Sequence, residues 1–269
     1  MTPFVSDPDF QLFVGDALDV LRSLPDESVD ACVTSPPYLD ARPEYPSPSL
    51  QDFELIFREL GRVVTGPALV NVGRLWHGGI ERLWWVDLLR ATDRAGWHLL
   101  DTLVWCKPNA NPIHGTVLAS SHEYVLILGQ PGDALNVDAI RTPYTDESKA
   151  RMARTWINGR GVKGDTRGHQ TGREINPLGA RPRSYVEIGV GREKGNEHPA
   201  PMATDLAAHL VTLGSWPDET VIDPFAGSGT TCLAARRLGR SSIGIELDPE
   251  YAKLAARRLQ QLSLLADVS

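Results

Sequence analysis

The sequence predicts an α/β fold built around a mostly parallel, Rossmann-like sheet. The first observation is an apolar segment at Val221 and Ile222, which ends in Asp223 and is followed by a glycine turn and a helix start. The second is another apolar strand, residues 242–247, with an acid, Glu246, near its end and seventeen residues past Gly229. The third is the alternation of short strand patterns with helical patterns along the chain, which is typical of βαβ units.

The turn within residues 220–231 has the features of a nucleotide site. Gly227 and Gly229 allow positive φ and let the backbone approach a ligand closely. The helix expected to begin at Thr230 or the next residue presents free N–H groups to a polar ligand. Glu246, at the end of the second strand, is placed to bind a ribose diol. The alternative is an ordinary strand–turn–helix that binds nothing.

The residues around this turn favour S-adenosylmethionine over other nucleotides. No lysine follows Gly229, as a P-loop would need, and Cys232 stands where a dinucleotide fold would place its third glycine. No basic residue lines the turn to hold phosphates. Asp223 would repel a pyrophosphate but would accept hydrogen bonds from an ammonium group. S-adenosylmethionine carries such an amino acid head together with a ribose and a sulfonium.

Composition is that of a globular protein with one unusual segment. The chain has 269 residues, 42% hydrophobic and 23% charged, enough for one substantial core with a smaller inserted module. Its net charge is -7, but residues 141–198 contain twelve Lys/Arg and seven Asp/Glu, a charge of +5, and the remainder is 15 - 27 = -12. The concentrated positive charge points to nucleic acid.

Targeting and metal signals are missing from the sequence. There is no signal-peptide pattern and no apolar run long enough to span a bilayer, so we expect no membrane partner. Cys32, Cys106 and Cys232 show no metal spacing, and no H-E-x-x-H motif occurs. We expect reduced core cysteines, a cytoplasmic protein and no metal.

The first two strands each end in polar residues. Residues 11–14 form a strand that ends before Asp16, and residues 17–24 form a short helix. Asp16 is a candidate for the adenine amino group of the cofactor, or the N-cap of that helix. Residues 29–33 form a buried strand that ends in Thr34-Ser-Pro-Pro-Tyr38. Its two prolines stiffen a loop that would fit a planar base bearing an amino group, unless the loop is only scaffolding.

The middle of the chain continues the alternation. Residues 39–49 are a proline-rich loop, 50–63 a helix and 68–72 a strand. Residues 80–95 are expected to be an amphipathic helix whose Trp84 and Trp85 belong to the core rather than to a base-stacking surface. Strands at 99–106 and 124–128 form the last, partly antiparallel edge of the sheet. Further on, residues 198–206 lead into a helix that runs to residue 213 and whose first turn is capped or lined by Thr204 or Asp205. Residues 249–262 form the closing helix.

Between about residues 129 and 195 neither the helical nor the strand period holds, and glycine and arginine accumulate. Such a segment suits target recognition, because arginine binds phosphates and reads guanine bidentately; the alternative is a solvated linker. The loop after residue 106 borders the expected base site or is a plain surface loop. The candidate DNA-binding residues are Lys107, Asn109, Arg160, Lys163, Arg167, Arg173, Arg181 and Arg183.

Two motifs carry a resemblance to a known family. Asp-Pro-Phe-Ala-Gly-Ser-Gly-Thr-Thr at 223–231 and Thr-Ser-Pro-Pro-Tyr at 34–38 resemble the cofactor and catalytic motifs of DNA amino methyltransferases. The Ser-Pro-Pro-Tyr form is typical of cytosine-N4 enzymes of restriction-modification systems, whereas adenine-N6 enzymes more often carry Asp-Pro-Pro-Tyr. The catalytic motif comes first in this chain, an order that resembles the circularly permuted β group.

The resemblance implies a seven-stranded, mostly parallel methyltransferase sheet with an antiparallel edge strand. It divides the chain into a catalytic half (1–129), a recognition insert (130–197) and a cofactor-binding half (198–269). The implied catalytic residues are Ser35, Pro36, Pro37 and Tyr38. The cofactor residues that the turn itself or the resemblance predicts are Asp16, Thr34, Pro199, Thr204, Asp223, Pro224, Phe225, Gly227, Ser228, Gly229, Thr230, Glu246 and Leu247.

These residues suggest a mechanism in which a flipped base stacks on Tyr38. The Ser35 hydroxyl and the Pro36 carbonyl would accept hydrogen bonds from the exocyclic amine and aim its lone pair at the methyl group. Carbon methylation of cytosine is disfavoured because no Pro-Cys pair occurs. Adenine N6, RNA, a protein glutamine, or a non-catalytic DNA-binding module are the alternatives.

The implied partner is double-stranded DNA in a prokaryotic cell. A separate restriction endonuclease and a homodimer are further expectations of the resemblance.

Overall fold

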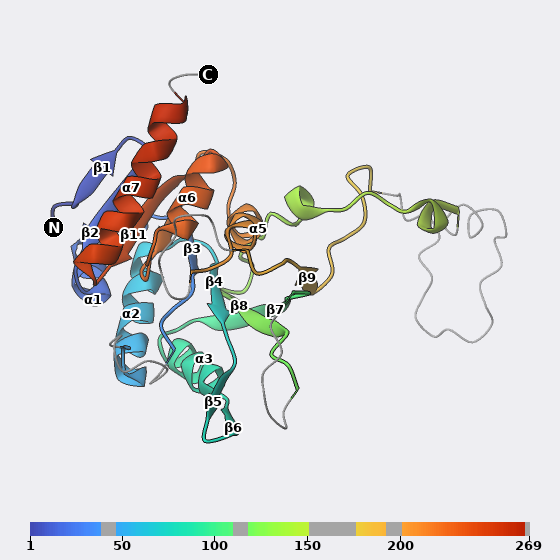
Figure 1. Ribbon diagram of the computed structural model, residues 1–269, viewed down its shortest axis with the longest axis horizontal. Helices are drawn as coiled ribbons and strands as arrows, with labels where there is room; N and C mark the ends of the chain where they lie inside the picture. The colour runs from blue at the N-terminus through green and yellow to red at the C-terminus, as the bar shows by residue number, and fades with distance from the viewer. Residues whose placement is uncertain (39–46, 110–117, 151–175, 192–200, 267–269) are drawn as a thin grey trace. The chain divides into compact units, whose positions relative to one another are not determined.

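The computed structural model describes residues 1–38, 47–109, 118–150, 176–191 and 201–266 (Figure 1). It divides into two compact units, one formed by residues 1–136 and 184–269 and the other by residues 137–183. All elements named below, except one short 3-10 helix, belong to the first unit.

The larger unit is organised around one sheet, in which nine strands are found among the described residues. They are β1 (Val5–Asp7), β2 (Phe10–Val14), β3 (Ala31–Thr34), β4 (Ala68–Val72), β7 (His98–Cys106), β8 (His122–Gly129), β9 (Tyr185–Glu187), β10 (Thr220–Asp223) and β11 (Ser241–Glu246). Their spatial order is β1-β2-β11-β10-β3-β4-β8-β7-β9.

The strand directions confirm the mostly parallel α/β fold. Strands β2, β11, β10, β3 and β4 are parallel neighbours, and β8 runs antiparallel between β4 and β7. The antiparallel strand expected at the edge therefore lies inside the sheet. Two short strands extend the expected seven, because β1 pairs antiparallel with β2 and β9 pairs parallel with β7. Strand β9 falls in the segment where the sequence showed no strand period.

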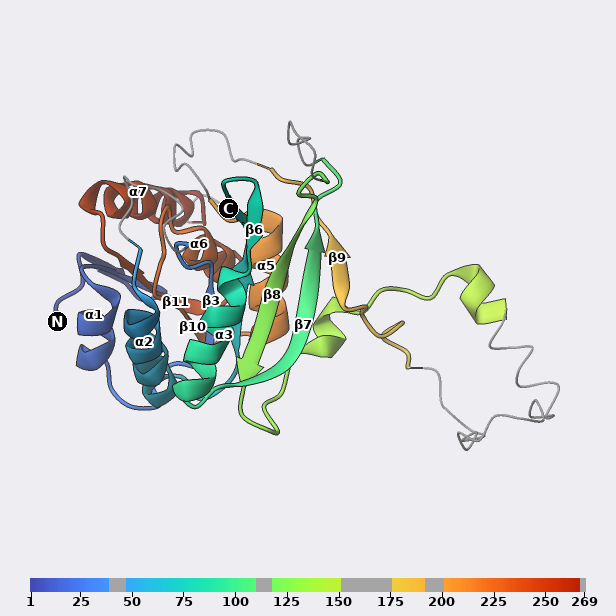
Figure 2. The ribbon, with the colours of Figure 1, turned by 90° about the horizontal axis from the view of Figure 1, so that it is seen from below.

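Helices cover both faces of this sheet (Figure 2). On one face lie α1 (Ala17–Ser23), α2 (Leu50–Val63) and α3 (Trp84–Arg94), and on the other lie α5 (Thr204–Gly214), α6 (Thr230–Arg237) and α7 (Pro249–Ala266). Each helix buries an apolar stripe against the sheet. Because helices cover both of their faces, the central strands are near-continuous apolar runs in the sequence. Cys32 and Cys232 are buried free thiols, and Cys106 is a partly buried one.

Helix α2 shows how local sequence sets an element. Phe53, Ile56, Phe57 and Leu60 are all buried, as their helical spacing predicts. A capping box at Ser49 satisfies the first N–H groups and explains the start of the helix at the next residue.

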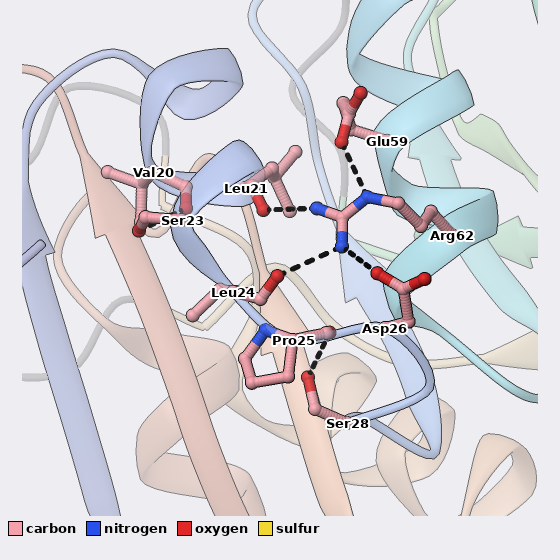
Figure 3. A network of polar contacts seen from close by, with 9 residues as sticks. All are labelled: Val20, Leu21, Ser23, Leu24, Pro25, Asp26, Ser28, Glu59 and Arg62. Carbon is pink, nitrogen blue, oxygen red and sulfur yellow. Dashed lines mark hydrogen bonds and ion pairs between the residues drawn. The ribbon is translucent and has the colours of Figure 1, made fainter.

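Arg62, in the last turn of α2, ties this helix to α1 (Figure 3). Its guanidinium donates hydrogen bonds to the carbonyls of Leu21 (2.8 Å) and Leu24 (2.9 Å), at the end of α1. It also forms ion pairs with Glu59 (2.8 Å) and Asp26 (2.6 Å). Helix C-termini leave carbonyls without intrahelical partners, so one arginine both caps α1 and fixes the α1–α2 packing.

The helix expected over residues 80–95 was predicted too long, because α3 begins only at Trp84. The residues before it form a hairpin of β5 (Leu75–His77) and β6 (Ile80–Arg82). Gly78 and Gly79 have φ of 58° and 77°, the two successive positive values of a type I′ turn. The two tryptophans do belong to the core, with Trp84 only 3% exposed.

The smaller unit, residues 137–183, contains a 3-10 helix at Val137–Ile140 and a bridge between Thr142 and Ala180. Within the described ranges no helix is long and apolar enough to cross a membrane. No group of three His, Cys, Asp or Glu side chains that could hold a metal ion is found there either.

Candidate active site

The carboxyl ends of four neighbouring parallel strands, in the order β2, β11, β10 and β3, lie side by side at the same end of the sheet, which is called the strand edge below. The chain order reverses between β10 and β3, and such a switch point is where open α/β sheets bind ligands. Short contacts join these ends: Gly15 N–H donates to the Glu246 carbonyl (3.0 Å), and the Thr34 hydroxyl donates to Asp223 Oδ1 (2.7 Å). The residues predicted to bind the cofactor and those predicted to bind the target base therefore lie at this same strand edge.

The glycine turn lies between β10 and α6, as predicted. Gly227 and Gly229 have φ of 53° and 74°, and α6 begins at Thr230. A Cβ atom on Gly229 would lie 2.9 Å from the Cβ of Ala255 in α7, so only glycine fits there. The turn is buried against α7 and leaves the first N–H groups of α6 at the strand edge.

Glu246 connects the turn to the end of β11. Its Oε2 accepts a hydrogen bond from Gly227 N–H (2.7 Å), and its Oε1 accepts one from Asp248 N–H (2.8 Å). The side chain is only 3% exposed, so the carboxylate is held in one position. Leu247, which follows it, is exposed.

Asp223 is a buried carboxyl at the end of β10. It accepts hydrogen bonds from the Thr34 hydroxyl and from Phe225 N–H (3.0 Å). Its pKa is raised to about 6, mainly by burial and to a smaller extent by the charge of the Glu246 carboxylate, while hydrogen bonds from Thr34, Thr231 and Phe225 act in the opposite direction. No basic side chain is among the causes of this shift.

This raised pKa leads to a prediction about stability. The carboxyl pKa is about 6 in the folded protein against an ordinary 3.8, so its stabilising contribution is complete below pH 3.8 and lost as pH rises through 6. We expect Asp223→Asn to raise the free energy of unfolding at pH 8 by about 1–3 kcal/mol and to change it little at pH 4. Urea unfolding at both pH values measures this.

Asp205→Asn, at an exposed position in the first turn of α5, is the matched control: its carboxylate interacts with the helix N-terminus, so its loss should lower the free energy of unfolding at pH 8 by at most about 1 kcal/mol, the opposite direction. A less stable Asp223→Asn protein at pH 8 would contradict the interpretation, because it would show that the ionised carboxylate stabilises the fold.

Asp16 is the N-cap of α1. Its Oδ1 accepts hydrogen bonds from Leu18 N–H (2.9 Å) and Asp19 N–H (3.4 Å), which confirms the capping alternative. The side chain is exposed at the end of β2, next to the Glu246 end of β11. Capping leaves its second carboxylate oxygen open to a further role.

Residues 35–38 leave the end of β3. Thr34 and Pro36 are buried, while Ser35, Pro37 and Tyr38 are partly exposed. The Tyr38 ring packs on Trp84 with centroids 4.9 Å apart. Burial, followed by the charge of Glu123, raises the pKa of Tyr38, and hydrogen bonds from the Gly73 backbone and from Ser35 oppose this.

The sequence did not reveal the polar side chains that lie next to Tyr38, namely Glu123 and its partner Asn71. Glu123 at the start of β8 accepts a hydrogen bond from Asn71 Nδ2 (2.8 Å) and forms an ion pair with Lys107. Asn71 is 2% exposed, and its Oδ1 has no hydrogen-bond partner in the described structure. The signal was an asparagine and a glutamate inside strand patterns, but their pairing depends on the β4–β8 register.

Arg258 in α7 is a second residue that the sequence did not reveal, and it corrects the expectation that no basic residue lines the glycine turn. Its guanidinium donates hydrogen bonds to the Ser228 carbonyl, the Ser228 hydroxyl (3.2 Å) and the Thr230 hydroxyl (3.2 Å). The closing helix thus holds the glycine turn through both packing and hydrogen bonds. An arginine inside an amphipathic helix offered no sequence signal for this contact.

The remaining predicted cofactor residues are arranged around the turn. Pro224 is buried, and Phe225 contacts Phe53 of α2 edge-on, with centroids 5.9 Å apart. Thr204 is the first residue of α5 but not its cap, because Ala203 is the N-cap and makes no side-chain cap bond. Pro199 lies outside the described residues.

The predicted DNA-binding residues differ in their surroundings. Lys107 is bound to Glu123 and stacks on Trp105 at 4.6 Å. Asn109 exchanges hydrogen bonds with the backbone of Val190 (2.7 and 3.2 Å). Arg181 and Arg183 are exposed in the smaller unit. Arg160, Lys163, Arg167 and Arg173 lie outside the described residues.

Known proteins match the chain over most of its length. A family model described as DNA methylase, of the N6/N4 methyltransferase type, matches residues 29–257. Type II methyltransferase M.BglII of Bacillus subtilis is 28% identical over 259 residues, covering 91% of this chain and 67% of that protein. Type II methyltransferase M.PvuII of Proteus hauseri is 26% identical over 285 residues, covering 92% and 82%.

Solved structures have the same fold. The PvuII DNA methyltransferase, described as cytosine-N4-specific, aligns with a TM-score of 0.69 over 96% of this chain and 88% of its own, at 20% identity. A protein of Thermus thermophilus, described as a putative DNA modification methylase and complexed with S-adenosyl-L-methionine, aligns with a TM-score of 0.61 over 93% and 94%, at 26% identity.

Proposed function

This chain belongs to the N6/N4 DNA methylase family, and from that premise we propose that it methylates the exocyclic N4 amine of a flipped cytosine in DNA. The protein is a DNA methyltransferase that uses S-adenosylmethionine. The nearest alternative is the N6 amine of adenine, which is the same chemistry on a different base.

The observation that carries the choice of cytosine is the serine that begins Ser35-Pro36-Pro37-Tyr38. These residues lie at the end of β3, beside Asp223 and the glycine turn, so a base placed there would face the cofactor site. The serine form resembles the cytosine enzymes, and the similar PvuII methyltransferase is described as cytosine-N4-specific.

The residues at the strand edge fit S-adenosylmethionine. A buried carboxyl with a raised pKa, such as Asp223, gains a cationic partner when an ammonium group binds. Glu246 is fixed at the end of the second strand of the βαβ unit, where ribose hydroxyls are bound. We assign Asp16 to the adenine amine. Because the Asp223 carboxyl must ionise to pair with ammonium, cofactor affinity should fall below about pH 6.

The other predicted cofactor residues complete this proposed site. Thr34 holds Asp223, and Ser228 and Thr230 are held by Arg258. We propose that the walls of the cofactor site include Pro199, Thr204, Pro224, Phe225 and Leu247.

In the proposed reaction, the protein positions an amine that is otherwise a poor nucleophile. Bound S-adenosylmethionine supplies the methyl group. The Ser35 hydroxyl and the Pro36 carbonyl accept hydrogen bonds from the target amine, and Tyr38 stacks on the base. Glu123 and Gly73 hold the Tyr38 hydroxyl, so the stacking ring is oriented before the base arrives. The nitrogen forms its bond to the methyl carbon as the sulfonium bond breaks, and its proton leaves to water.

Mass spectrometry of nucleosides tests the proposal. The purified protein is incubated with unmethylated genomic DNA and labelled S-adenosylmethionine, and the digested nucleosides are identified. N4-methylcytosine is the expected product, and sequencing the labelled fragments then reveals the recognition site. N6-methyladenine would overturn the choice of base, and no label in DNA would overturn the assigned reaction.

The resemblance to restriction-modification enzymes also suggests the setting of this reaction. We propose double-stranded DNA as the substrate, a separately acting endonuclease and a homodimer as partners, and the prokaryotic cytoplasm as the location. The basic segment 130–197, with Lys107 and Asn109 at its border, is proposed for target recognition. A DNA-binding module without catalytic activity is disfavoured, because it would not require both the glycine turn and the loop of residues 35–38, here called the base loop, at one strand edge.

A further inference from the structure

The β5–β6 hairpin follows β4, whose carboxyl end lies beside that of β3 and the loop of residues 35–38, and it projects beyond the sheet (Figure 1). It continues directly from β4 through Gly73, which lies against the Tyr38 hydroxyl: a Cβ on this glycine would be 2.3 Å from that oxygen. Trp84 Nε1 donates a hydrogen bond to the Gly73 carbonyl (2.9 Å) just after the hairpin. Both ends of the hairpin are therefore anchored beside Tyr38.

One face of the hairpin is locked by its own side chains. Arg74 donates two hydrogen bonds to Glu81 (2.8 and 2.7 Å), and its guanidinium stacks on Trp76 at 4.5 Å. A bidentate arginine–carboxylate pair fixes geometry as well as adding energy. The turn at Gly78 and Gly79 matches the twist of the strands, so the ribbon is stiff.

The other face is open to solvent toward the turn, while Leu75 at its base is partly buried against the core. Strand alternation and the pairing of His77 with Ile80 and of Leu75 with Arg82 place these four side chains together on it. His77 and Arg82 are exposed, and Ile80 is 66% exposed, a high value for a large apolar side chain. A Cβ on either turn glycine would meet nothing within 4 Å. The exposed part of this face thus combines the apolar Ile80 and His77 next to the turn with Arg82 at the base of the hairpin.

We propose that this hairpin enters the major groove of the DNA substrate and that Ile80 at its tip occupies the space vacated by the flipped base. Three residues per strand give a reach of about 10 Å, similar to the depth of a major groove, which admits a two-stranded ribbon. Apolar wedges such as isoleucine stabilise unstacked base steps. Arg82 contacts the phosphate backbone. The inference rests on the proposed base flipping.

Methylation kinetics with Ile80→Ala test this role on duplexes that carry the recognition site read from the labelled DNA. One duplex has the target base paired, and the other has it opposite an abasic position. We expect kcat/KM to fall about tenfold on the paired duplex and to stay within about twofold of the parent on the unpaired one, since a wedge matters least when the base is already free. Calorimetry should show unchanged binding of S-adenosylmethionine.

Phe4→Ala is the matched control, because Phe4 is an exposed apolar residue beside β1, the terminal strand of the large sheet, five strands away from β4. It should behave as the parent on both duplexes. Equal activity of Ile80→Ala and the parent on the paired duplex would overturn the inference, as would an equal loss on both duplexes. If the parent enzyme itself gains nothing from an unpaired target, base flipping in the proposed function fails instead.

Discussion

Replacing Gly229 by alanine is expected to weaken binding of S-adenosylmethionine by at least about a hundredfold, or about 3 kcal/mol. The residue has φ of 74°, which costs an L-residue about 1–2 kcal/mol. The new methyl group would also lie 2.9 Å from the Ala255 Cβ and 3.4 Å from its Cα, so the turn or α7 must move. Either movement displaces the N–H groups that face the proposed cofactor. Isothermal titration calorimetry measures the affinity.

Two further variants separate the collision from the backbone strain. Gly239→Ala has φ of 71° but meets nothing within 4 Å, so it should cost about 1 kcal/mol of stability and leave cofactor binding unchanged. Adding Ala255→Gly to the Gly229→Ala protein removes the nearest atom and should restore part of the affinity. If Gly229→Ala bound the cofactor as tightly as Gly239→Ala does, the turn would not be the cofactor site.

Replacing Ser35 by alanine is expected to lower kcat about 10²- to 10³-fold without changing the dissociation constant of S-adenosylmethionine. The hydroxyl is one of two proposed acceptors for the target amine, and removing one positioned group from a reaction centre typically has this effect. Ser35 is partly exposed, so the fold should tolerate the change. Single-turnover methylation of unmethylated genomic DNA gives the rate, and calorimetry gives the affinity.

Ser28→Ala is the control, because its hydroxyl donates only to the nearby Pro25 carbonyl, away from the strand edge. It should methylate at the parent rate. A Ser35→Ala protein with a near-parent rate would contradict the proposed role of the hydroxyl and leave the Pro36 carbonyl as the main acceptor.

Local patterns were enough to predict most elements of the fold. The spacing of Phe53, Ile56, Phe57 and Leu60 located α2 to the residue, and the glycine turn marked the start of α6. These features depend on interactions within a few residues, where sterics and helix or strand period decide. The same local patterns failed at the hairpin of residues 75–82. Its two strands are only three residues long, and Ile80 also fits the helical period of the residues that follow, so the predicted helix began too early.

The sequence by itself determined the family and the α/β fold, because the two motifs that indicated them, residues 34–38 and 223–231, are runs of adjacent residues with their own backbone requirements. Only the tertiary structure decided what holds those motifs. Glu123 reaches Tyr38 because β8 pairs antiparallel with β4, and Arg258 reaches Ser228 because α7 packs on the turn. Such contacts join residues that are far apart in the chain, and their geometry is set by strand register and helix packing rather than by any local pattern.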